Sequence, residues 1–114
     1  MKIPNSHQAV IDLEKLAGYC LDSTHWRGKH KARLFSSILG LTPTDAPELK
    51  AILQQVVTTD QAELGLNNEH GQRYKIDFEI CRSGARALVR SCWIIRPNED
   101  FPRLTSCYIL RSLP

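Results

Sequence analysis

The chain lacks the long apolar segments and the cysteine spacings that mark membrane or secreted proteins. No apolar run in its 114 residues approaches the 18 needed to cross a bilayer. Residues 1–5 contain no apolar stretch of the kind that forms a signal-peptide core. The four cysteines, at positions 20, 81, 92 and 107, include no C-x-x-C pair, which is typical of a reduced protein. We therefore expect a cytoplasmic protein.

Motifs of high specificity are missing as well. The sequence contains no P-loop, no dinucleotide-binding glycine pattern, no Gly-x-Ser-x-Gly and no His-Glu-x-x-His. No acidic cluster has the spacing of a magnesium site, and a zinc site built from Cys20, His25 and His30 would match no standard ligand pattern. We therefore expect no metal and no cofactor, so that any chemistry would use side chains alone.

The composition is that of one domain with an uneven charge distribution. An apolar share of 42% and this length favour a single domain over residues 1–114 with a modest core. The net charge is +3, yet residues 1–35 carry six Lys and Arg against three Asp and Glu, and residues 82–114 carry six against two. If the two basic ends meet in space, they form a cationic face for a polyanion; otherwise they are ordinary solvated charges.

The first half of the sequence has the apolar spacing of helices. A first helix is expected after a cap at Asn5 or Ser6, and a second over residues 29–39 that ends at Gly40. A third helix is expected from Asp45, which has a glutamate three residues on in a capping-box-like arrangement. The sequence therefore predicts about three helices in its first half.

The second half of the sequence predicts strands. Residues 73–80 alternate charged and apolar side chains without a break, the period of a strand with one buried face. Residues 87–95 and 103–110 are rich in strand-forming residues, and residues 63–67 can add a short strand before them. The order predicts an α+β fold, in which N-terminal helices pack on a C-terminal antiparallel sheet of three to four strands.

The most informative segment is residues 25–35, in which basic residues directly precede an apolar run. At 100° per residue, Lys29 and Arg33 lie on the wet face of the second helix, whereas Lys31 falls on the apolar face one turn before Phe35. An ammonium group there lines a cleft, finds a partner, or reaches solvent along a packed stem. Because a helix start also favours an anion, the segment indicates phosphate binding, with RNA as the source of the phosphate.

Metal-free RNA cleavage needs a base, a cation and an acid, and the sequence offers all three. His25, in the connection before the second helix, is the candidate base. Lys31 or Arg103 would stabilise the charged phosphorane, and Tyr108 would protonate the leaving oxygen. Ser106 adds a hydroxyl beside Tyr108, and strict alternation along the strand would place Arg103 on the opposite face from both.

Further basic and aromatic side chains are candidates for binding substrate. They are Arg27, Lys29, His30, Arg33 and Trp93. The guanidinium of Arg27 can grip a phosphate in two places, and the indole of Trp93 can stack a base. The alternatives without a functional role are a solvated cation for Arg27 and a core position for Trp93.

Several short segments of the sequence, spread in order over nearly the whole chain, match the pattern of a known family. They are Lys15-Leu16 with Tyr19-Cys20-Leu21, His25 followed by Gly28-Lys29-His30-Lys31-Ala32-Arg33-Leu34-Phe35, Leu39-Gly40, Gly71-Gln72-Arg73-Tyr74, Ser91-Cys92-Trp93-Ile94, and Pro102-Arg103-Leu104-Thr105-Ser106-Cys107-Tyr108. In these segments the chain resembles an uncharacterised bacterial family of small free-standing proteins and C-terminal domains of polymorphic toxins. That family is in turn similar to metal-independent RNase toxins of the barnase, EndoU, colicin and RelE types.

The resemblance implies cleavage of tRNA or mRNA and a cognate antitoxin or immunity protein as partner. The family's usual functional positions correspond to His25, Lys31, Arg103, Ser106 and Tyr108. Threonine is common in the family where this chain has Ser106, so the hydroxyl is kept. Trp26 stands where the family often has a proline, which changes the loop that aims His25. No toxin-delivery region precedes the domain, so we expect an intracellular toxin–antitoxin component.

A non-catalytic module that binds nucleic acid or protein is the alternative. It would be an antitoxin, an immunity protein or a degenerate toxin relative, and it would carry a basic surface without a convergent set of His, Lys and hydroxyl groups. A domain that binds only another protein would instead carry a continuous apolar or cationic patch and no pocket. The positions of His25 and Lys31 relative to Ser106 and Tyr108 distinguish these hypotheses. The sequence does not indicate an oligomeric state.

Overall fold

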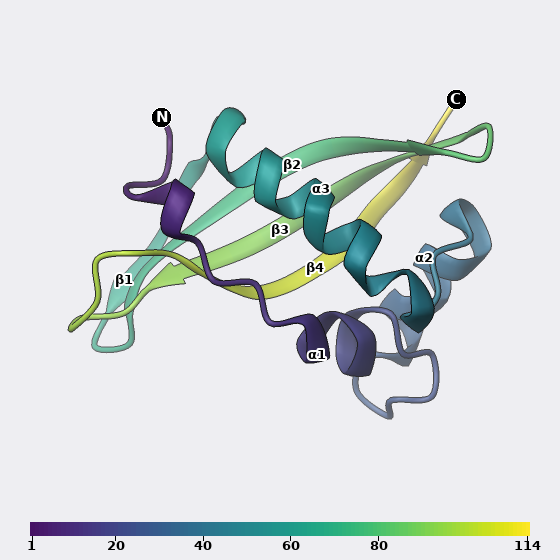
Figure 1. Cartoon of the computed structure of the whole chain (residues 1–114), viewed down its shortest axis with the longest axis horizontal. Helices are drawn as coiled ribbons and strands as arrows, with labels where there is room; N and C mark the ends of the chain where they lie inside the picture. Colours follow the sequence, from purple (N-terminus) through teal and green to yellow (C-terminus); the bar gives the residue numbers. More distant parts are fainter.

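The computed structural model describes all 114 residues and shows an α+β fold, with helices in the N-terminal half and a four-stranded antiparallel sheet after them. The strands follow one another in the order β1-β2-β3-β4 (Figure 1). Their bounds are β1 (Glu63–Asn68), β2 (Gly71–Arg82), β3 (Ala85–Ile95) and β4 (Arg103–Leu113). The expected number and order of strands are therefore confirmed, and the fourth is the short N-terminal one.

Helix α3 lies across one face of this sheet, and α2 lies near its β3–β4 side (Figure 1). The helical elements are the 3-10 turn η1 (Ser6–Gln8), α1 (Leu13–Lys15), the π-helical turn η2 (Leu16–Cys20), α2 (Lys29–Leu39), the 3-10 turn η3 (Pro43–Asp45) and α3 (Ala46–Thr59). None of these helices combines the length and the apolar character needed to cross a membrane.

The first expected helix is wrong as a continuous element. Asn5 has a φ of 53° and makes no side-chain cap, and its amide donates instead to the main chain of the β3–β4 loop. Val10 forms a parallel bridge with Arg103 at the edge of β4, which takes this stretch out of helical geometry. The helix proper begins only after Asp12, whose carboxylate accepts the cap hydrogen bond.

The second expected helix is confirmed at both ends. Helix α2 follows Gly28 and stops at Gly40, whose φ of 65° suits a residue without a Cβ. Its buried positions are Ala32, Phe35 and Leu39. Leu34 lies off this stripe and remains 40% exposed.

The third helix has its capping box one turn earlier than expected. Thr42 and Asp45 form the box, because the main-chain N–H of Thr42 donates to the carboxylate of Asp45. Glu48 is thereby left to accept from Arg82 of β2, at 2.7 Å from its Nε. The buried positions of α3 are Ala46, Leu49, Leu53, Val56 and Val57.

The face of the sheet toward α3 belongs to the hydrophobic core, and we call it the inner face. Its side chains are Tyr74, Ile76, Phe78 and Ile80 of β2, Ala87, Val89, Ser91 and Trp93 of β3, and Leu104, Cys107 and Ile109 of β4. The indole N–H of Trp93 donates to Ser91 Oγ at 2.9 Å, and that hydroxyl donates to the carbonyl of Ile76 at 3.1 Å. The buried polar atoms of this pair are therefore satisfied.

Strand β4 departs from strict alternation at Thr105. Cys92 pairs with Ser106 and Trp93 pairs with Leu104, which leaves Thr105 as an extra residue in a bulge. The hydroxyl of Thr105 donates to the carbonyl of Cys92 at 3.1 Å. The expected separation of Arg103 from Ser106 is therefore wrong, because the extra residue turns both toward the face away from α3.

Candidate functional site

The face of the sheet away from α3, which we call the outer face, is a grid of directly opposed and mostly polar side chains. Across β2, β3 and β4 its rows are Arg73–Ile94–Arg103, Lys75–Cys92–Ser106, Asp77–Arg90–Tyr108 and Glu79–Leu88–Arg111. Residues directly opposed in an antiparallel pair have side chains in contact distance of one another. Consecutive rows lie two residues, or about 7 Å, apart along β2 and β3, whereas on β4 the register shifts make two of the steps three residues long.

Lys31 meets this grid from helix α2. Its Nζ lies 4.1 Å from the ring centroid of Tyr108, in the geometry of a cation–π contact. Lys31 stands in the first turn of α2, and Tyr108 is half-buried in β4. Of the alternatives expected for this amine, a partner is the one observed, and Lys31 as a whole residue remains exposed.

Arg90 lies opposite Tyr108 in the same row. Its guanidinium makes a two-point ion pair with Asp77, at 2.8 and 2.9 Å. The carboxylate of Asp77 raises the pKa of Arg90 above its ordinary value, and the oxygen of Tyr108 adds to this effect. Hydrogen bonding to Arg90 in turn lowers the pKa of Asp77. A fixed cation therefore lies next to the phenol oxygen, with part of its charge offset by the carboxylate.

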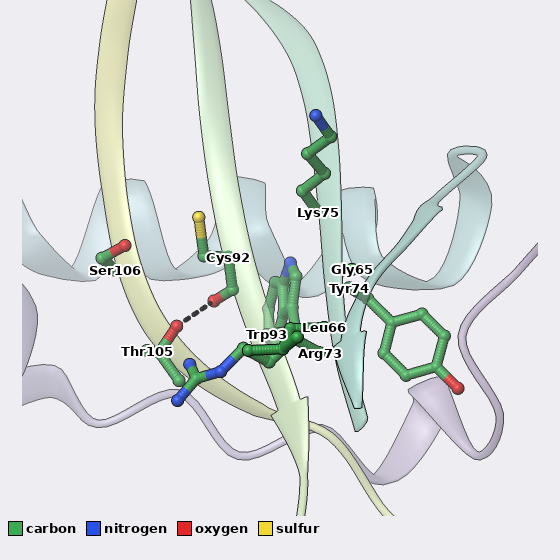
Figure 2. A pocket seen from close by; sticks show the side chains of 9 residues that line it. All are labelled: Gly65, Leu66, Arg73, Tyr74, Lys75, Cys92, Trp93, Thr105 and Ser106. Atoms are coloured by element: carbon green, nitrogen blue, oxygen red, sulfur yellow. Dashed lines mark hydrogen bonds between the residues drawn. The ribbon is translucent and has the colours of Figure 1, made fainter. Parts of the chain in front are cut away.

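Ser106 lies in the neighbouring row, between the Lys31–Tyr108 contact and a hollow in the outer face. Its hydroxyl makes no hydrogen bond within the protein, so it is free to bind a ligand. The hollow has a volume of about 280 Å³ and is lined by Gly65, Leu66, Arg73, Tyr74, Lys75, Cys92, Trp93, Thr105 and Ser106 (Figure 2). Lys75, Cys92 and Ser106 form a row across three strands at its upper side (Figure 2).

Arg103 lies on the outer face but is held by a carboxylate. Its guanidinium makes two hydrogen bonds with Glu99, at 2.9 and 2.8 Å, and stands 5.1 Å from the ring centroid of Phe101. These bonds raise the pKa of Arg103 and lower that of Glu99. Arg103 is also two rows away from Tyr108. Of the two cations expected to stabilise a phosphorane, Lys31 is therefore the one beside the phenol.

His25 is oriented by its own loop. Its Nδ1 accepts the main-chain N–H groups of Arg27 and Gly28, at 3.2 and 3.3 Å, and its ring packs edge-on against Tyr19 at 4.8 Å. With Nδ1 accepting, the neutral ring carries its proton on Nε2, as assigned from these hydrogen bonds. No hydrogen bond or ring contact joins His25 to Lys31 or Tyr108. The expected base and the expected acid therefore make no direct contact with each other.

The remaining candidates divide between the surface and the core. The guanidinium of Arg27 lies 4.5 Å above the ring of Trp26, which is 72% exposed. Lys29, His30 and Arg33 lie on α2 without an ion pair. Trp93 is wholly buried on the inner face. The expectation that it stacks a base is therefore wrong, and the alternative of a core position is confirmed.

No group of three or more His, Cys, Asp or Glu side chains gathers so as to hold a metal ion. The zinc alternative built on Cys20, His25 and His30 therefore finds no support. Cys20 and Cys107 are free thiols in the core, and burial raises the pKa of both. Cys92 is a free thiol beside Ser106 in the hollow.

Several outer-face residues were not expected as site residues. Arg73, Lys75 and Asp77 belong to the charged alternation of β2, which places them on one face but not beside any other element. Arg90 shows no local signal, because its place opposite Tyr108 depends on the register of β3 with β4. The alternation of β2 is a signal that could have predicted its three residues as members of one face. The position of Arg90 could be found only from the pairing of β3 with β4.

Comparison with known proteins gives a family but no activity. A family model described as a domain of unknown function, DUF6883, matches residues 2–111, which include every helix, strands β1 to β3 and most of β4. No curated protein and no solved structure matches the chain. The chemistry of the outer face is thus the main source for a functional proposal.

Proposed function

We propose, for a chain that belongs to the DUF6883 family, that it is a metal-independent ribonuclease of the toxin type. The single observation that supports this proposal is the Lys31–Tyr108 contact of 4.1 Å, which lies in one row with Arg90 and next to the free hydroxyl of Ser106. Two cations, a phenol and a hydroxyl on one exposed face are suited to a phosphodiester group. The tRNA or mRNA substrate, the cytoplasmic location and the cognate antitoxin are proposals that come from the resemblance to RNase toxins.

The reaction is an attack by the ribose 2′-OH on the adjacent phosphorus. A 2′-oxygen–phosphorus bond forms and the phosphorus–5′-oxygen bond breaks, which yields a 2′,3′-cyclic phosphate and a 5′-OH. Lys31 and Arg90 stabilise the charge of the phosphorane, and Ser106 donates to a non-bridging oxygen. Tyr108 donates its proton to the leaving 5′-oxygen.

Proton balance requires an acceptor for the 2′-OH proton. In this structure the Nδ1 of His25 accepts two main-chain N–H groups of its own loop, so this nitrogen is not available to take the 2′-OH proton. Water takes up the 2′-OH proton and returns one to Tyr108 at the end of the cycle. A role for His25 as the base requires the loop of residues 22–28 to release its Nδ1.

Purified protein and RNA in the presence of EDTA test this proposal. We expect cleavage products that end in 2′,3′-cyclic phosphate, and a rate reduced about 100-fold or more in Lys31→Ala and in Tyr108→Phe. Lys50→Ala is the matched control, because Lys50 is a lysine of α3, away from the outer face and without an ion pair. Intact RNA with every preparation of well-folded wild type would overturn the proposal, as would unchanged cleavage in Tyr108→Phe.

A binding module without catalysis is the second candidate. It is favoured by two ion pairs, in which carboxylates offset part of the charge of Arg90 and of Arg103, and by the loop-bound position of His25. This candidate predicts RNA binding with no cleavage, and equal binding by wild type and Tyr108→Phe. The same two proteins therefore distinguish the candidates.

A further inference from the structure

The hollow of about 280 Å³ in the outer face contains two basic side chains that the proposed cleavage does not use. Arg73 makes no ion pair, whereas Arg90 and Arg103 on the same face are each held by a carboxylate. Lys75 has only a long contact of 3.5 Å with the exposed Glu63. In Figure 2 the side chain of Arg73 extends from β2 across β3 at the edge of the hollow. These two cations are available to a ligand.

An irregularity in β1 opens the hollow. The pairing of β1 with β2 shifts between Leu64 and Asn67, so residues 65 and 66 do not follow the regular ladder. The side-chain amide of Gln72 bridges the gap, donating to the carbonyl of Gly65 at 3.1 Å and to that of Arg73 at 2.9 Å. Leu66, which is 64% exposed, provides an apolar rim.

The hollow is continuous with the proposed catalytic row. Ser106 belongs to its lining and lies one row from Tyr108, a step of about 7 Å along the strand. Arg73 lies one row further along the same direction. A chain of phosphodiester units held at Tyr108 would therefore place its next unit over Lys75 and Arg73.

We propose that this hollow is a subsite for one nucleoside phosphate unit next to the scissile phosphate. The guanidinium of Arg73 grips the phosphate in two places, Lys75 adds a point charge, and the base packs against Leu66. The subsite rests on the proposed ribonuclease function only in its position relative to the cut. Its binding of a mononucleotide is independent of cleavage.

Titration of the isotope-labelled protein with uridine 5′-monophosphate, followed through backbone amide signals, tests the subsite. We expect shifts at Leu66, Arg73 and Ser106, and binding about tenfold tighter than that of inorganic phosphate or of uridine. Arg73→Ala is expected to weaken binding about tenfold. Arg111→Ala is the matched control, because Arg111 is another unpaired arginine of the outer face, two rows beyond Ser106.

The outcomes separate this subsite from the proposed function. Nucleotide binding in the hollow without RNA cleavage would support the subsite and contradict the ribonuclease, whereas cleavage with no signal change in the hollow would contradict the subsite alone. Equal weakening in Arg73→Ala and Arg111→Ala would show general charge attraction and overturn the proposal. Lys75→Ala, checked for a native amide spectrum, serves as a second variant if Arg73→Ala fails to fold.

Discussion

The ammonium of Lys31 stands 4.1 Å from the ring centroid of Tyr108, and this contact joins the first turn of α2 to the outer face of β4. One residue thereby has two separable properties, because the ring of Tyr108 holds the cation while its hydroxyl, whose oxygen lies beside Arg90, can donate its proton to a ligand. The same contact places the charge of Lys31 beside Tyr108, which is opposite Arg90 in one row and one row from Ser106. Substitutions that change the ring and the hydroxyl of Tyr108 independently can separate its effect on stability from its effect on RNA cleavage.

Tyr108→Phe should abolish RNA cleavage with little effect on stability, and Tyr108→Leu should reduce both. The phenylalanine keeps the ring under Lys31, whereas leucine removes a contact worth about 0.5–1 kcal/mol at an exposed site. Thermal unfolding at pH 7 measures the difference. A phenylalanine variant as unstable as the leucine variant would show that the hydroxyl itself has a structural role.

Asp77→Asn should tighten the binding of RNA. Removal of the carboxylate frees the charge of Arg90 in the row of Tyr108, so a non-cleavable 2′-deoxy oligonucleotide should bind more tightly with a steeper dependence on salt. The stability cost should be small, about 0–1 kcal/mol, because both side chains are partly exposed. Glu69→Gln, in an exposed turn, removes the same charge elsewhere and is the control. Equal tightening in both variants would contradict a role for the Arg90 position.

Acid should destabilise the protein partly through Glu79. Hydrogen bonding to Arg86 lowers the pKa of this carboxyl from 4.5 to about 2. A lowered pKa stabilises the folded state above the unfolded value, and the contribution is lost as the pH falls toward about 2. The midpoint of thermal unfolding should therefore fall less steeply between pH 4.5 and 2 in Glu79→Gln than in wild type. Parallel curves would mean that the ion pair with Arg86 is screened in solution.

Ser91→Ala should destabilise the core although it removes only one oxygen. The indole N–H of Trp93 and the carbonyl of Ile76 would both lose their partner, which costs about 1–3 kcal/mol for a buried donor. Urea unfolding measures the loss, and Ser83→Ala in the β2–β3 turn is the exposed control. Similar midpoints for the two variants would indicate that water enters the vacated position.

Sequence patterns predicted those parts of the fold that are determined locally. The glycines at 28 and 40 bound α2, and the alternation of residues 73–80 gave the two faces of β2. The stretch before Asp12 could not be predicted, because its pairing with the edge of β4 replaces a helix that the apolar spacing favours. Local periodicity carries no information about such a distant partner.

The candidate site was predictable in composition but not in arrangement. Lys31, Ser106 and Tyr108 could be named from residue types and spacing. Strict alternation separates Arg103 from Ser106 and Tyr108, and this prediction is wrong because a bulge at Thr105 has no clear signature in one sequence. The sequence does not distinguish a stacking from a core position for Trp93, because its burial depends on which face of the sheet α3 covers.

The bridge between Val10 and Arg103 has a consequence for solubility. The carbonyl of Val10 accepts from the N–H of Leu104, and the N–H of Val10 donates to the carbonyl of Pro102. The N-terminal segment therefore covers the beginning of β4, which would otherwise be an open strand edge. Bare edges recruit strands from other molecules and promote aggregation. Removal of the first ten residues would therefore expose the edge of β4 as a template for fibril-like growth.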